Sequence, residues 1–121
     1  MAKKTIMIVD DEHIINKAIE DIFKPEGYNV IKAESGLEAL EKSKKIIPDL
    51  ILLDIMMPGM DGWDTCAKIK ANKKTEKIPI VFLTAKIDPI SRSMGMLASK
   101  DYITKPFQYK DIVSRVKNII G

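Results

Sequence analysis

Five side chains that could carry out chemistry come at the ends of apolar, strand-length segments of this 121-residue sequence: Asp10, Asp11, Asp54, Thr84 and Lys105. Three carboxylates within a few ångströms of one another repel, so such a cluster needs a cation or bound protons. One lysine supplies only one of the missing positive charges. Because the candidate metal ligands are all oxygens, these residue types favour a hard ion such as Mg²⁺.

The same residues indicate phosphoryl chemistry. Mg²⁺ usually binds proteins through one or two carboxylates and keeps its other positions for water and phosphate oxygens. A carboxylate such as Asp54 is a nucleophile that can accept a phosphoryl group, and it needs no general base. Phosphoryl transfer depends mainly on position and on neutralising the transferred oxygens, which Mg²⁺, Lys105 and the hydroxyl of Thr84 would do.

The elements that must position these residues follow from hydrophobic periodicity. Apolar segments alternate with helical patterns, which is typical of an α/β fold with a parallel sheet buried on both faces. Five strands are predicted, at Ile6–Val9, Tyr28–Ala33, Leu50–Leu53, Ile80–Leu83 and Asp101–Thr104. Five helices are predicted: one with a stripe centred near Ile15, Ala18, Ile19 and Ile22, then Gly36–Lys45, Trp63–Ala71, one beginning at Asp88 and Pro89, and one built on Ile112, Val113, Val116, Ile119 and Ile120.

Ligands of an open parallel sheet bind outside the carboxyl ends of its strands. Each of the five chemical residues stands at such an end, so they are expected to meet at one edge. Asp54 closes an apolar segment, where a purely structural residue is rarely charged. A functional cluster is therefore favoured over a set of turn residues.

Composition excludes several classes of protein. With 45% hydrophobic and 31% charged residues, the chain is neither disordered nor collagenous, and its length suits one domain over residues 1–121. No apolar run approaches the ~20 residues of a membrane helix. The lone Cys66 and the lack of a signal-peptide pattern predict a cytoplasmic location. The net charge of +3 forms no basic stripe, which argues against direct nucleic-acid binding.

Four motifs in order at the strand ends resemble the receiver domain of two-component response regulators, and the resemblance covers the whole chain: Ile8-Val9-Asp10-Asp11-Glu12, the segment from Leu52 to Gly62, Leu83-Thr84-Ala85, and the segment from Asp101 to Phe107. It implies a chemotaxis-regulator-like, doubly wound sheet with the strand order 2-1-3-4-5. It also implies a signalling switch that receives a phosphoryl group from a histidine kinase or histidine phosphotransfer protein. Such a switch catalyses only its own phosphorylation and dephosphorylation.

The resemblance also implies roles at the site. Asp54 would be the phosphoacceptor, and Mg²⁺ would be held by Asp10, Asp11, Asp54 and the backbone carbonyl of Met56. Asp10 would act largely through bound water.

Three further residues would respond to the phosphoryl group. Thr84 and Lys105 would contact its oxygens, and Tyr102 would change orientation when Thr84 moves. A cis peptide before Pro106 is implied, which would aim the lysine inward.

The resemblance further implies two interaction surfaces. Ile14 lies at the margin of the stripe of the first helix and is expected to be partly exposed. Binding of the phosphoryl donor would involve Ile14, Pro106 and Phe107. A phosphorylation-promoted homodimer would be held by two ion pairs, Arg92 with Asp111 and Asp101 with Arg115.

Two other functions stay open. A Mg²⁺-dependent phosphatase with an aspartyl nucleophile usually has a second carboxylate two residues later, where this sequence has Met56. A receiver fold used only as an interaction module would not need all five chemical residues.

One segment departs from the family pattern. Thr84 and Lys105 are 21 positions apart, one fewer than usual, and Ala98-Ser99-Lys100 replaces the usual Gly-Ala before the last strand. Because glycine forms the least strained helix C-cap, the fourth helix is expected to end irregularly or fray.

Overall fold

The computed structural model describes residues 3–85 and 88–121. Its sheet has the strand order β2-β1-β3-β4-β5, and every neighbouring pair is parallel. The strands are β1 (Thr5–Val9), β2 (Asn29–Ala33), β3 (Leu50–Leu53), β4 (Ile80–Thr84) and β5 (Asp101–Thr104). The predicted fold class and strand order are confirmed, and each strand end lies within one residue of its predicted place.

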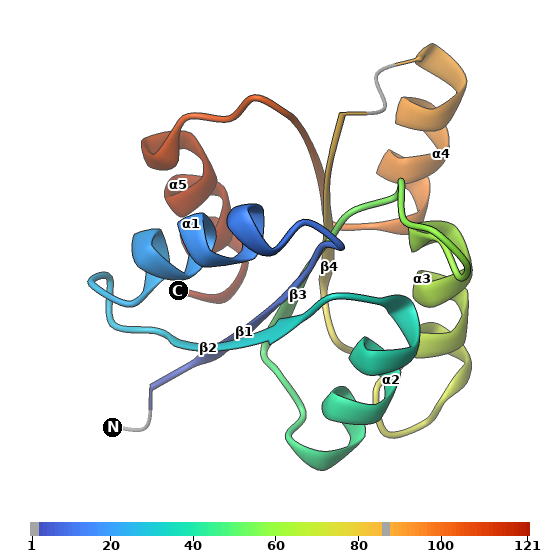
Figure 1. Cartoon of the computed structure of the whole chain (residues 1–121), viewed down its shortest axis with the longest axis horizontal. Helices are drawn as coiled ribbons and strands as arrows, with labels where there is room; N and C mark the ends of the chain where they lie inside the picture. Colours follow the sequence, from blue (N-terminus) through green and yellow to red (C-terminus); the bar gives the residue numbers. More distant parts are fainter. Residues whose placement is uncertain (1–2, 86–87) are drawn as a thin grey trace.

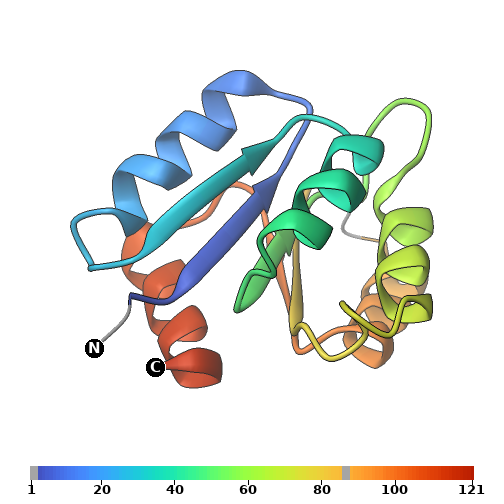
Figure 2. The ribbon, with the colours of Figure 1, turned by 90° about the horizontal axis from the view of Figure 1, so that it is seen from below.

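Helices cover both faces of the sheet: α1 (His13–Phe23), α2 (Gly36–Lys45), α3 (Gly62–Ala71), α4 (Pro89–Ala98) and α5 (Tyr109–Ile120). Figures 1 and 2 show α1 and α5 on one face and α2, α3 and α4 on the other. Within the described residues, no helix is long and apolar enough to span a bilayer.

Strand side chains alternate between two apolar cores, one under each helix layer. In β1, Ile6 and Ile8 pack with residues of α1 and α5, whereas Met7 and Val9 pack with residues of α2 and α3. All four are at most 1% exposed. Burial on both faces explains why the central strands are continuous apolar segments that could be recognised in the sequence.

Helix α1 is rotated relative to its predicted orientation. Its buried residues are Asn16, Ile19, Glu20 and Phe23, whereas Ala18, expected in the stripe, is exposed. The rotation is explained by the hydrogen bonds of a buried polar side chain. The side-chain amide of Asn16 donates to the carbonyl oxygens of Asp10 at 2.8 Å and Ala33 at 3.2 Å. Since buried strand-end carbonyls need partners, this amide turns inward at the expense of Ala18.

Helix α4 has a standard N-terminal cap and no glycine at its C-terminal end. It begins as predicted, with Asp88 as N-cap and Pro89 at its start. Its end is irregular, as expected. The following residue, Ser99, is extended, and its hydroxyl lies within hydrogen-bond distance of the carbonyl oxygens of Gly95 and Asp101. Ser99 thus replaces the missing glycine cap.

The apolar side chains of α4 face solvent. Of its ten residues, all of them described, only Ser91 and Gly95 are buried. Ile90, Met94 and Leu97 are 74%, 52% and 89% exposed. The side of this helix that packs against the sheet therefore carries small residues, and Gly95 there lies against Tyr102 of β5.

Candidate functional site

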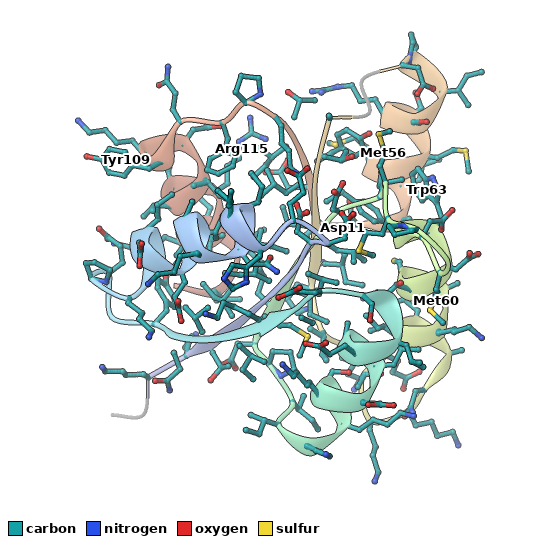
Figure 3. All side chains as sticks on the ribbon, viewed as in Figure 1. Asp11, Met56, Met60, Trp63, Tyr109 and Arg115 are labelled. Carbon is teal, nitrogen blue, oxygen red and sulfur yellow. The ribbon has the colours of Figure 1, made fainter. Side chains whose placement is uncertain are left out.

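The three predicted carboxylates meet at the carboxyl edge of the sheet. Asp10 and Asp11 follow β1, and Asp54 follows β3, the neighbouring strand. The backbone N–H of Asp54 donates to the carbonyl of Val9 at 2.9 Å, which ties the two strand ends together. Carboxylate oxygens of the three aspartates lie within 4.8 Å of one another; Asp10 and Asp54 are buried, and Asp11 is exposed. Figure 3 shows Asp11 and Met56 on the two loops of this edge.

Lys105 joins this cluster from β5. Its Nζ lies 2.6 Å from Oδ2 of Asp10 and 3.4 Å from Oδ2 of Asp54. Its backbone N–H donates to the carbonyl of Thr84 at 2.9 Å, and the peptide bond to Pro106 is cis, as the resemblance implied. One amine thus contacts two of the three carboxylates.

The electrostatics of the cluster follow from burial and charge. Burial raises the pKa of Asp10, although hydrogen bonds from Lys105 and from the backbone N–H of Glu12 oppose the shift. Burial alone would lower the pKa of Lys105, but its hydrogen bond to Asp10 and the charges of Asp10 and Asp54 outweigh burial and raise it. Lys105 therefore carries its charge at neutral pH and can bind an anionic oxygen.

The acidic cluster suits a hard divalent cation. Its donors are oxygens from three carboxylates close enough to share one ion, and a single lysine does not balance their charge. One oxygen of Asp54 already accepts the backbone N–H of Met56 at 3.2 Å, which fixes how that carboxylate is oriented. The Met56 carbonyl as a ligand stays a prediction.

Thr84 and Tyr102 lie on the face of the sheet that α4 covers. Phe82 pairs with Tyr102 across β4 and β5, and Thr84 follows Phe82 by two positions, so their side chains share a face. Both Thr84 and Tyr102 are at most 1% exposed. The guanidinium of Arg92 lies 5.9 Å from the centre of the Tyr102 ring.

The inward position of Tyr102 explains the small residues of α4. A Cβ atom added to Gly95 would lie 2.1 Å from the tyrosine ring. The ring therefore occupies the space that a larger side chain of α4 would need. Sequence reasoning missed this role of Gly95, and the only available signal was a glycine inside a helical pattern.

Two other residues of the site were missed. The side chain of Asn16 donates a hydrogen bond to the carbonyl of Asp10. It was missed because a polar residue in an amphipathic helix is normally predicted to face solvent. Gly62, the first residue of α3, lies against the backbone of Asp54 and Ile55, where a Cβ would be 2.3 Å from the Asp54 carbonyl oxygen. A glycine eight residues after the candidate nucleophile was the signal that could have found it.

The candidate partner residues lie at the surface beside this edge. Ile14 on α1 is 79% exposed, which confirms its expected exposure. Pro106 is exposed, and Phe107 is half-buried against the core under α1 and α5. Their part in binding a phosphoryl donor stays a prediction.

The candidate dimer residues are only partly brought together. Within one chain, Arg115 reaches Oδ1 of Asp101 at 3.0 Å and Oδ1 of Asp111 at 3.1 Å. Arg92 instead lies over the ring of Tyr102. The ion pairs across a two-fold axis stay a prediction, and Arg115 would have to exchange or share partners to form them.

Fold and site together define a class of protein, a doubly wound α/β domain with an acidic cluster and a half-buried lysine at the carboxyl edge of its sheet. The family model of the response regulator receiver domain matches residues 6–117, and the chain belongs to this family.

Solved structures of similar proteins agree with this assignment. A CheY-like response regulator receiver domain protein from Methanospirillum hungatei is 40% identical, with a TM-score of 0.86 over 99% of this chain and 96% of that one. A receiver protein domain from Methanoculleus marisnigri is 36% identical, with a TM-score of 0.80 over 99% and 98%. The chemotaxis protein CheY4 of Vibrio cholerae is 26% identical, with a TM-score of 0.92 over 98% and 100%.

Proposed function

We propose that residues 1–121 form a receiver domain that works as a phosphorylatable switch, with Asp54 as the phosphoacceptor. The main support for this proposal is the position of the buried Asp54 carboxylate. It lies 3.4 Å from the Lys105 amine and beside two further carboxylates at the carboxyl edge of the sheet. Asp54 directly follows β3, the strand between β1 and β4, so its carboxylate starts from a central position among the strand ends.

The proposed reaction is a direct phosphoryl transfer. An oxygen of Asp54 forms a bond to phosphorus while the bond from phosphorus to the donor breaks, and the donor leaves with the electron pair. Lys105 and Thr84 would contact the transferred oxygens and stabilise their charge. Asp10, Asp11, Asp54 and the carbonyl of Met56 would hold Mg²⁺, which when bound supplies the positive charge that Lys105 alone cannot.

The proposed donor is a phosphohistidine on a histidine kinase or histidine phosphotransfer protein. The exposed Ile14, on the first turn of α1, supports a docking surface next to the acidic edge. Family membership supports the same class of partner. Direct binding of nucleic acid or membrane forms no part of this proposal.

A phosphatase is the weaker alternative. Phosphoryl-enzyme hydrolysis by a phosphatase needs an acid or base near the nucleophile. Two residues after Asp54 the chain has Met56, whose thioether cannot transfer a proton and whose side chain is 57% exposed. An interaction module without phosphorylation is disfavoured because the five chemical residues are all present. The three aspartates cluster within 4.8 Å, and Lys105 contacts two of them, Asp10 and Asp54.

Acetyl phosphate provides the direct test of the proposed function. With Mg²⁺ present, we expect one phosphoryl group per chain by intact-mass measurement, and with a chelator we expect none, because the clustered carboxylates repel an incoming phosphate. Equal labelling with and without the chelator, or no labelling at all, would contradict the proposal.

The lifetime of the phosphorylated form should depend on Met56. Hydrolysis needs a water aligned with the phosphorus, and an apolar side chain beside the phosphoryl group cannot orient it. We expect Met56→Asn to accelerate loss of phosphate, on the order of tenfold, because an amide can hold that water. Met56→Leu, which keeps an apolar side chain of similar size, is the matched control and should leave the rate unchanged. Mass spectrometry over time distinguishes the two, and equal rates in both variants would reject the idea.

A further inference from the structure

Two connections share a hollow at the amino edge of the sheet, opposite to the acidic cluster. Residues 46–49 connect α2 to β3, and residues 72–79 connect α3 to β4; both lie at the bottom of Figure 1. The hollow between them has a volume of about 290 Å³. We name it the amino-edge hollow; the residues that line it include Ile47, Pro48, Lys73, Lys74, Lys77 and Pro79.

The amino-edge hollow combines an apolar wall with a positive rim. Ile47, which is 52% exposed, and the prolines at positions 48 and 79 form the apolar wall. Lys73, Lys74 and Lys77 are exposed, and within the described part of the chain none of them forms an ion pair. The one carboxylate on the hollow, Asp49, already accepts the backbone N–H of Thr5 at 2.7 Å.

The loop that carries the three lysines is held in place from inside. Its buried Thr75 donates from the hydroxyl to the carbonyl of Ile69 at 2.7 Å. The amine of Lys70 donates to the carbonyl of Ile78 at 2.6 Å, and the backbone N–H of Lys74 donates to the side chain of Asn72 at 2.8 Å. A surface that is fixed before binding loses less conformational entropy when a partner docks.

We propose that the amino-edge hollow docks an acidic protein segment, in which one apolar side chain flanked by carboxylates enters the hollow. The carboxylates pair with the lysine rim, and the apolar side chain covers Ile47, Pro48 and Pro79. The three lysines favour a partner with negative charge, and the apolar wall favours an apolar side chain at its centre. An apolar centre with a polar rim is the usual composition of a protein–protein interface.

The shape and lining favour a peptide over other anionic partners. A bilayer is engaged by side chains that protrude into it, whereas a hollow is filled by a side chain that protrudes from the partner. Nucleic-acid bases need aromatic side chains for stacking, and no aromatic residue lines the hollow. The surface lies at the edge opposite to Asp54, so docking there does not rest on the proposed phosphorylation.

Fluorescence anisotropy with the full chain tests the proposal. The probe is a labelled peptide with one leucine between two runs of three glutamates. We expect saturable binding that weakens with salt, and about tenfold weaker binding by Lys73→Gln/Lys77→Gln, since each exposed ion pair contributes only modestly. The control Lys17→Gln/Lys110→Gln removes the same charge from α1 and α5 and should bind as the unaltered chain does. Replacing leucine by serine in the probe should weaken binding about fivefold.

Three results would overturn the proposal. One is no saturable binding of the peptide, and another is an equal loss in both double variants. The third is equal or tighter binding to phosphatidylserine vesicles or to a single-stranded oligonucleotide, which would make the lysines a general anion surface. Phosphorylation by acetyl phosphate should be unchanged in Lys73→Gln/Lys77→Gln, so failure here is distinguishable from failure of the proposed function.

Discussion

Asp54→Asn is expected to lose phosphoryl incorporation from acetyl phosphate almost completely, by at least ~100-fold, because removal of a covalent nucleophile removes the reaction itself. The amide has nearly the shape of the carboxylate and can still accept the backbone N–H of Met56. The fold should therefore persist. Intact-mass measurement in the presence of Mg²⁺ reads the loss directly.

Asp61→Asn is the matched control for this experiment. Asp61 is the N-cap of α3, where its side chain accepts the backbone N–H of Asp64 at 2.9 Å. Asparagine caps helices as well as aspartate does, so this variant changes the same charge on the same loop without loss of the cap. Labelling should remain. If instead Asp54→Asn is labelled as well as Asp61→Asn, the phosphoacceptor is another residue.

The acidic edge could be predicted from the sequence because its residues are exceptional where they stand. Asp10 and Asp54 each follow a buried apolar segment directly. A charged residue is rarely placed there for structural reasons alone, so its presence indicates function. Parallel topology then brings the strand ends together whatever the details of packing. The contact between Lys105 and Asp10, made across 95 positions of sequence, also needs the length of the lysine side chain, because β3 and β4 lie between β1 and β5.

What periodicity could not supply is the rotation and packing of individual helices. Asn16 overrides the apolar stripe of α1 because two strand-end carbonyls need its amide. The ring of Tyr102 leaves room only for Gly95, which turns the larger apolar residues of α4 to solvent. Both are decided by contacts between different elements of the fold, which the periodicity of one helix does not contain.

Gly62 is where a close contact with backbone should have a large effect on stability. Gly62→Ala is expected to lower the free energy of unfolding by about 3 kcal/mol. The added Cβ would lie 2.3 Å from the carbonyl oxygen of Asp54 and 2.5 Å from Cα of Ile55, and backbone atoms cannot move aside as a flexible side chain can. Alanine is a better helix former than glycine, but that gain is at most ~1 kcal/mol and does not offset the overlap.

Gly27→Ala separates this steric effect from backbone strain. Gly27 has a φ of +94°, yet no atom lies within 4 Å of an added Cβ, so its substitution costs only the left-handed conformation, about 1–2 kcal/mol. Denaturant unfolding should therefore show a larger midpoint shift for Gly62→Ala than for Gly27→Ala at an unchanged slope. Because the overlap pushes on the residue that carries the carboxylate, folded Gly62→Ala should also be phosphorylated more slowly, whereas Gly27→Ala should not. A smaller midpoint shift for Gly62→Ala would mean that the loop after β3 yields easily, and that Asp54 is not held by the start of α3.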